Sequence, residues 1–311
     1  MSAAKLMQDE AGALRPPGPV ELAGALDPAT QRIYRDALGA LRRAGIEFLI
    51  GGAHALAPYT GIVRDTKDLD VFLRKGDCQP ALDALEAAGF TTDLTFPHWL
   101  GKAYSGDRFV DLIFGAGNGI AMVDDLWFAH SVPGRVLGVP VLLCPPEEMI
   151  WSKAFIMERE RYDGADVAHL IQAFGPRLEW RRLLERFGPR WRVLLSHLIL
   201  FGFIYPGERA TVPDAVMAHL LRRLDHERVS PGEDARVCDG TLLSRQQYLV
   251  DVNGRGYADG RLAPLGAMTA VEIAHWTAAI EEAAAPPAPP SNLSVLRRSG
   301  GALSRARRRR R

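Results

Sequence analysis

The stretch that decides the fold runs from residue 48 to residue 77 and reads FLIGGAHALAPYTGIVRDTKDLDVFLRKGD. It places Asp68 and Asp70 one residue apart in an apolar run of strand length. Side chains alternate along a strand, so the two carboxylates share one face. Their neighbours Leu69 and Val71 point the other way, into the core. Two unpaired carboxylates this close raise each other's pKa and cost stability, so a cation is expected between them.

A later stretch adds a third carboxylate. Residues 107–115, DRFVDLIFG, read as a strand in which the lone Asp111 is flanked by Val110 and Leu112. If this strand lies beside the first, at a spacing of about 4.8 Å, Asp111 joins the cluster. Carboxylate oxygens suit Mg²⁺ that is bound together with the phosphates of a nucleotide, and three carboxylates can hold two ions. The residues expected to bind metal are therefore Asp68, Asp70 and Asp111.

The glycine pair Gly51-Gly52 stands between an apolar strand and the start of a helix. Without a Cβ atom, the backbone N–H groups can approach an anion, and the helix dipole adds attraction. Arg64 and Thr66 lie in the loop before the acidic strand, from which they can reach phosphate oxygens or brace the acids. The pattern predicts a phosphate site beside the carboxylates. The simpler alternatives are a tight turn at the glycines and a strand edge at which basic loop residues pair with the acids.

The hydrophobic pattern divides the chain into four parts. Apolar runs of strand length alternate with helices up to about residue 145, and beyond it the pattern is helical almost throughout. Asp27 and Pro28 form an N-cap and first-turn signal for the first helix. The predicted parts are a flexible N-terminus at 1–26, a sheet-containing domain at 27–145, a helical domain at 146–282, and a disordered linker with an Arg-rich tail at 283–311.

The predicted fold class is α+β, with a small mixed sheet and flanking helices followed by a mostly helical C-terminal domain. Periodicity and turn residues set the expected elements. The expected strands are 46–50, 68–73, 90–96, 100–104 and 108–114. The expected helices are 27–45, 53–59, 78–89, 146–159, 163–174, 179–187, 190–203 and 213–226.

Composition places the chain among globular proteins. It has 311 residues, of which 47% are hydrophobic and 24% charged, enough for one large domain or two smaller ones. No run of eighteen apolar residues occurs and the N-terminus carries acids, so we expect no membrane span or secretory signal and a cytoplasmic location. The three cysteines are far apart, which favours reduced thiols over disulfides or a zinc site.

The charge is divided unevenly along the chain. The formal net charge is +1, but eight of the 38 basic residues are arginines that follow residue 286, where there is no acid. The preceding part holds 30 basic and 37 acidic residues, a charge of about −7. A body of this sign is not a general nucleic-acid binder, whereas the Arg-rich tail can attach to phosphates without sequence preference.

These motifs resemble a known family. Residues 50–72, IGGAHALAPYTGIVRDTKDLDVF, look like the signature of the nucleotidyltransferase superfamily of the DNA polymerase beta type. In that superfamily a Gly-Gly or Gly-Ser turn precedes an Asp-x-Asp strand, and a third Asp follows on a later strand. The form is most similar to the bacterial branch that includes abortive-infection type IV toxins and aminoglycoside nucleotidyltransferases. The resemblance covers roughly residues 30–175.

The segment at 145–171, PPEEMIWSKAFIMERERYDGADVAHLI, also resembles that branch, whose first helices after the sheet carry a Lys, an Arg and an Asp. Those residues map here onto Lys153, Arg161 and Asp166, with Asp163 as an alternative for the last. The resemblance makes 27–145 the catalytic domain. The nucleotide-binding residues that it implies, together with those predicted above, are Gly51, Gly52, Arg64, Thr66, Lys153 and Arg161.

The resemblance implies transfer of a nucleoside monophosphate from an NTP to an acceptor hydroxyl or phosphate. The catalytic Asp68, Asp70 and Asp111 would act with two Mg²⁺ ions. RNA, a protein or a small molecule such as an antibiotic stays open as the acceptor, and the tail is a possible nucleic-acid contact. The alternative is a catalytically inactive member that binds a nucleotide or a partner.

Overall fold

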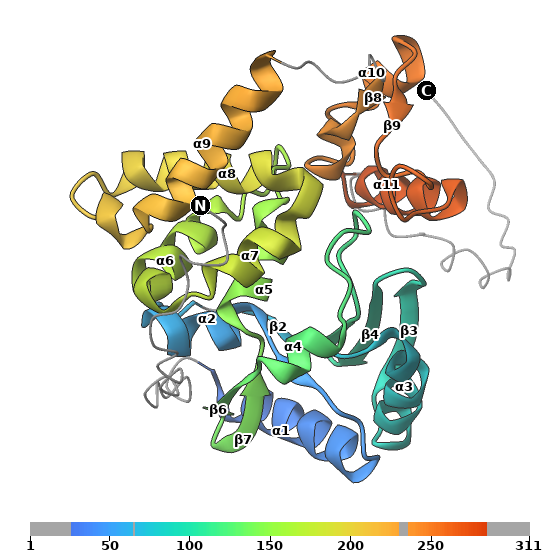
Figure 1. Ribbon diagram of the computed structural model, residues 1–311. Coiled ribbons are helices and arrows are strands. Elements are labelled where there is room, and N and C mark those ends of the chain that lie inside the picture. The colour runs from blue at the N-terminus through green and yellow to red at the C-terminus, as the bar shows by residue number, and fades with distance from the viewer. Residues whose placement is uncertain (1–25, 65, 230–235, 285–311) are drawn as a thin grey trace, which may run out of the picture.

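The structure is a computed structural model that describes residues 26–64, 66–229 and 236–284 (Figure 1). The predicted flexible N-terminus and the linker with its Arg-rich tail lie almost entirely outside these residues. Within the described part, no helix is both long enough and apolar enough to cross a bilayer.

A mixed seven-stranded sheet forms the centre of the first half of the chain, in the order β3-β4-β5-β2-β1-β7-β6. Two neighbouring pairs, β2 with β5 and β1 with β7, are parallel, and the other neighbours are antiparallel. The strands are β1 (Leu49–Ile50), β2 (Asp68–Phe72), β3 (Thr91–Phe96), β4 (Leu100–Ser105), β5 (Arg108–Ile113), β6 (Val132–Val136) and β7 (Val139–Leu143).

Three predicted helices and one that was not predicted, α4 (Asp125–Ala129), pack against this sheet. Asp27 caps α1 (Pro28–Arg43), because its Oδ1 accepts the N–H groups of Ala29 and Thr30 at 2.9 and 3.0 Å, a bond pattern typical of an N-cap. The sheet is further flanked by α2 (Gly52–Thr60), α3 (Cys78–Ala87) and the short α4. The predicted α+β class with a small mixed sheet is confirmed.

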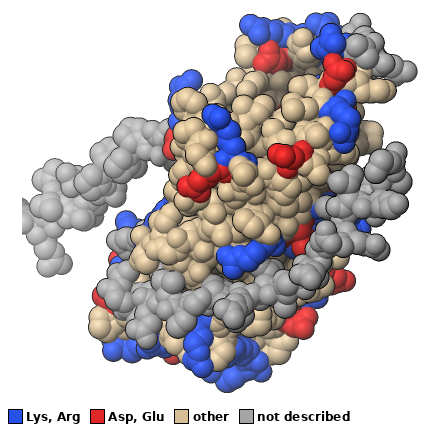
Figure 2. All heavy atoms as spheres, turned by 60° about the vertical axis from the view of Figure 1, so that its left-hand side comes forward, with Lys and Arg blue, Asp and Glu red and all other residues tan. Residues whose placement is uncertain are grey.

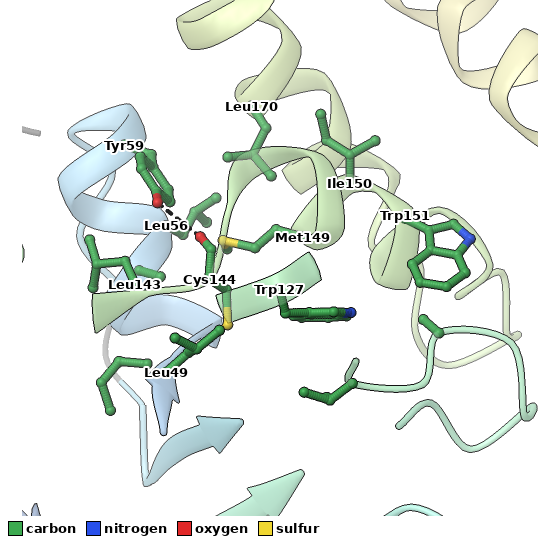
Figure 3. Packing of buried hydrophobic residues seen from close by; sticks show 14 of the residues in the cluster. Leu49, Leu56, Tyr59, Trp127, Leu143, Cys144, Met149, Ile150, Trp151 and Leu170 are labelled. Carbon is green, nitrogen blue, oxygen red and sulfur yellow. Dashed lines mark hydrogen bonds between the residues drawn. The ribbon is translucent and has the colours of Figure 1, made fainter. Parts of the chain in front are cut away.

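The core continues from the sheet into the helices that follow it. Figure 3 shows α2 joined to the end of β7 by the Tyr59 hydroxyl, which donates to the Cys144 carbonyl at 2.8 Å. Leu56, Met149 and Leu170 surround this bond. All of these side chains belong to one buried hydrophobic cluster, so the strand ends and the first helices after the sheet are held together by apolar burial.

The second half is mostly helical, as expected. Its main helices are α5 (Pro146–Ala154), α6 (Gly164–Phe174), α7 (Trp180–Phe187), α8 (Trp191–Ile204) and α9 (Asp214–Val229). A C-terminal segment follows with β8 (Val237–Cys238), α10 (Leu249–Gly254), β9 (Ala258–Asp259) and α11 (Ala270–Ala284). Figure 1 shows this segment, in orange and red, above the sheet and beside the helices.

Two predicted elements are markedly shorter in the structure, and the helix expected at 213–226 runs on to Val229. The strand expected at 46–50 is paired only over β1. The helix expected at 146–159 ends at Ala154, because the next residues turn back as a tight hairpin. In this hairpin Met157 forms a β-bridge with Tyr162, and the N–H of Asp163 donates to the Ile156 carbonyl at 3.1 Å. The β6–β7 hairpin was not predicted.

A buried charge network joins the helices to one another. The side chains of Glu147 and Glu148 on α5 are fully buried. Arg182 on α7 donates to Glu147 at 2.6 Å and to Glu148 at 2.5 Å. Arg186 donates both to Glu148 at 3.1 Å and to Asp124, which lies just before α4, at 2.6 Å. The network therefore connects the helical half to a loop of the sheet half.

Loss of Arg182 should be strongly destabilising, since it would leave two buried carboxylates without their main partner. We expect Arg182→Leu to lower the free energy of unfolding by about 3–5 kcal/mol. Arg181→Leu, on the exposed side of the same helix and paired with Glu185 at 3.6 Å, should change it by less than about 0.5 kcal/mol. Urea unfolding measures both values, and similar small losses in the two variants would contradict a structural role of the network.

Candidate functional site

Three carboxylates meet on one face of the sheet. β2 pairs with β5 in parallel, and in this register Asp70 lies directly opposite Asp111. One oxygen each of Asp68, Asp70 and Asp111 lies within 4.8 Å of the others. Leu69 and Val71 on the other face of β2 are fully buried. The structure thus brings together the three acids that the alternation of side chains and the assumed strand neighbours predict.

Burial and the neighbouring charges shift the pKa of two of these acids, Asp70 and Asp111. Burial, followed by the charges of Asp68 and Asp111, raises the pKa of Asp70 from 3.8 to about 7. Lys153 and Arg161 oppose this shift in part. Burial also raises the pKa of Asp111, against the effect of Lys102. The ionised cluster is therefore unfavourable without further positive charge.

Lys102 supplies one positive charge directly. It lies opposite Asp111 in the antiparallel register of β4 and β5, and its Nζ donates to Asp111 Oδ1 at 2.6 Å. The ammonium also lies 4.3 Å from the centre of the Phe109 ring, a cation–π geometry. The sequence prediction missed this role, because the register of a hairpin partner cannot be derived from the alternation pattern of one strand.

The glycine pair packs against the same carboxylates. Gly52 begins α2 with a φ of +54°, and a Cβ atom built on it would lie 1.6 Å from Asp70 Oδ2. The N–H of Gly51 donates to the backbone carbonyl of Asp70 at 3.0 Å, and a Cβ atom there would lie 2.2 Å from the Phe72 ring. Close packing against β2 therefore excludes a side chain at both glycines and brings the start of α2 to the acids.

Thr66 and Arg64 occupy the loop between α2 and β2, but they have different partners. The Thr66 hydroxyl donates to the Asp68 carboxylate, so this residue braces the acidic strand. Arg64 instead pairs with Asp166 on α6 at 2.5 Å, and its side chain is 41% exposed. The structure thus places Thr66 on the cluster and Arg64 at the edge of the helices beside it.

The basic residues predicted after the sheet form a second charge group. Lys153 Nζ at the end of α5 bridges Asp163 at 2.9 Å and Asp166 at 2.8 Å. Arg161 donates two hydrogen bonds to Asp163, at 2.9 and 2.8 Å, while 62% of its side chain stays exposed. We call these residues and Arg64 the cationic group. Its members are Arg64, Lys153, Arg161, Asp163 and Asp166, which carry three positive and two negative charges.

Within the cationic group, Arg161 and Lys153 lower the pKa of Asp163. Burial acts to raise the pKa of Asp163, but the hydrogen bonds from Arg161 and the charge of Lys153 outweigh it and hold this pKa at about 2. Both basic residues act on the pKa of Asp70, so the group lies close enough to influence the carboxylate cluster. A net positive group beside a net negative one is an arrangement that suits a metal–phosphate ligand.

Comparisons with known proteins reveal similarity of structure alone. No protein-family model matches the chain, and no curated protein is detectably similar to it. Similar solved structures include the antibiotic-resistance factor ANT(2'')-Ia, at 15% identity over 66% of this chain and 100% of that one, with a TM-score of 0.33. The lincosamide antibiotic adenylyltransferase LnuA matches at 12% identity over 45% of this chain and 94% of its own, with a TM-score of 0.34.

A third similar structure is JHP933 from Helicobacter pylori, at 12% identity over 67% of this chain and 100% of that chain, with a TM-score of 0.35. An adenylyltransferase, which is one kind of nucleotidyltransferase, is thus among the structures to which this chain is similar. At these identities and TM-scores we take neither an activity nor a substrate from them.

Proposed function

We propose that the chain is a Mg²⁺-dependent nucleotidyltransferase that moves a nucleoside monophosphate from an NTP to an acceptor hydroxyl or phosphate. The observation that carries the proposal is the meeting of Asp68, Asp70 and Asp111 on two paired parallel strands, next to the start of a helix. The resemblance of residues 50–72 to nucleotidyltransferases supports it independently of this geometry.

The donor set fits magnesium. All three side chains offer hard oxygen ligands, and their mutual distances allow an ion to be shared between them. The raised pKa of Asp70 indicates an excess of negative charge that a divalent cation would offset. Asp68 and Asp70 would hold one ion and, with Asp111, a second. Bound Mg²⁺ would supply charge neutralisation at the phosphates and a lower pKa for the acceptor hydroxyl.

The chain's own residues would bind and orient the reactants. Arg161 and Arg64, which are partly exposed beside the cluster, would hold phosphate oxygens, and Lys153 would keep the two acids of the cationic group in place. The acceptor oxygen would attack the α-phosphorus, and the bond to the β-phosphate oxygen would break with loss of pyrophosphate. Lys102 occupies one oxygen of Asp111, which leaves the other to accept the acceptor's proton.

The charge distribution on the described surface is compatible with more than one acceptor. Figure 2 shows a face on which basic and acidic side chains are interspersed instead of gathered by sign. One experiment therefore tests RNA, a protein and a small molecule as acceptors together. NTPs labelled at the α-phosphate are added to a lysate with the protein, and the labelled product is identified.

Removal of one carboxylate should abolish this transfer. In Asp68→Asn and Asp70→Asn a charged oxygen ligand is lost, so we expect Mg²⁺-dependent labelling to fall by at least about a hundredfold. Asp36→Asn, on the exposed face of α1, serves as the control and should transfer at the parent rate. Full activity in either cluster variant would refute the proposal. If NTP with Mg²⁺ stabilises the parent but no label is transferred, the result would support the alternative, an inactive protein that binds a nucleotide.

The pKa of Asp70 predicts how stability depends on pH in the presence of EDTA. Below about pH 3.8 the carboxyl is protonated in both the folded and the unfolded chain, and the fold then pays no penalty for its charge. The stability of this protonated state is lost as pH rises through about 7, where the native carboxyl must ionise. At pH 8, Asp70→Asn should therefore unfold at a higher urea concentration than the parent. Its free energy of unfolding should be larger by at most about 4 kcal/mol, and this difference should shrink at pH 5. Asp36→Asn should show no such trend. If the parent were more stable than Asp70→Asn at pH 8, the result would contradict a destabilising charge on Asp70 in the cluster.

A further inference from the structure

A pocket of about 380 Å³ lies where three separate parts of the chain meet. The first is the loop after β5, which Figure 1 shows reaching toward the C-terminal segment. The second is the residue before α8, and the third is the C-terminal segment itself. The lining side chains that matter here are Asn118, Ile120, Met122, Arg190, Leu242 and Leu265.

Arg190 has no partner in the part of the chain that the structure describes. No hydrogen bond or ion pair joins it to another described residue, and its Nε atom is fully buried. A buried donor without an acceptor costs about 1–3 kcal/mol, and more when it is charged. Arg190 also immediately precedes α8, whose first N–H groups receive no side-chain cap and carry the positive end of the helix dipole. The Arg190 guanidinium therefore brings an unpaired positive charge to the lining of the pocket.

Other residues of the pocket lining are held in place by contacts within the chain. The Asn118 side chain donates to the Leu242 carbonyl at 2.8 Å and accepts the N–H of Ile120 at 3.1 Å. Its polar groups are thus already bonded, and the other side chains of this part of the lining are apolar. Gly119, at a φ of +77°, lets the loop lie against Met268. The arginine is consequently the unpaired polar side chain of a preformed, otherwise apolar pocket.

We propose that this pocket binds a small organic carboxylate, with its charged group on Arg190 and an apolar body against Ile120, Met122, Leu242 and Leu265. A single guanidinium matches the charge and the two oxygens of a carboxylate, whereas a phosphate dianion would require a second cation. A volume of this size lies within the range of small-molecule sites. The proposal is independent of nucleotidyl transfer.

Calorimetric titration with 4-phenylbutyrate tests the proposal, with the neutral 4-phenylbutan-1-ol as matched ligand. We expect the carboxylate to bind the full chain at least about tenfold more tightly than the alcohol, because only it forms a charge-assisted hydrogen bond. In Arg190→Met that preference should disappear. Leu265→Trp, at a half-exposed position, should fill the pocket and weaken the binding of both ligands. Arg181→Met should behave as the parent.

Stability gives a second readout that needs no ligand. Since the Arg190 side chain has no partner among the described residues, the melting temperature of Arg190→Met should equal or exceed that of the parent. A clear loss of stability would show that the guanidinium already has an acceptor and would overturn the proposal. Absence of 4-phenylbutyrate binding up to about 5 mM, equal affinity for acid and alcohol, or unchanged binding by Arg190→Met would overturn it as well.

Discussion

The parallel pairing of β2 with β5 is the constraint on which the rest of the site depends. It sets Asp70 opposite Asp111, while on the reverse face the apolar residues of both strands are completely buried. A shift of one residue in either strand would move its acids into the core and its apolar side chains out of it. The hydrophobic effect on one face therefore fixes the position of the carboxylates on the other, although their mutual repulsion opposes it.

Two sources of positive charge make this position tolerable, and they come from different elements of the fold. Lys102 approaches Asp111 from the neighbouring strand β4. The cationic group approaches from the helices, because α5 ends at Ala154 and the following hairpin returns Asp163 to Lys153. The early end of α5, which differs from the apolar periodicity, thus allows the hairpin to bring Arg161 and Asp163 back to Lys153.

Periodicity predicted those parts of the site that lie within one element, and it failed where the site depends on how elements meet. The faces of Asp68 and Asp70 follow from alternation along one strand. Asp111 required the added assumption that its strand is a neighbour, which the register confirms. Lys102 could not be predicted, because the turn between β4 and β5 sets its register. The motif resemblance indicated Lys153, Asp166 and, as an alternative, Asp163, but not that the ammonium bridges the two acids.

Gly52 shows how closely the fold and the candidate site are linked. The space that a side chain would take there is already filled by Asp70 Oδ2, so packing alone requires the glycine. The same contact brings the positive end of α2 to the most strongly perturbed carboxylate, where the dipole favours its ionised form. A fold that used a larger residue here would have to move α2 away from β2 and lose that stabilisation. The geometry of the glycine turn, at which we propose that phosphate binds, is therefore a consequence of how this helix packs on the acidic strand.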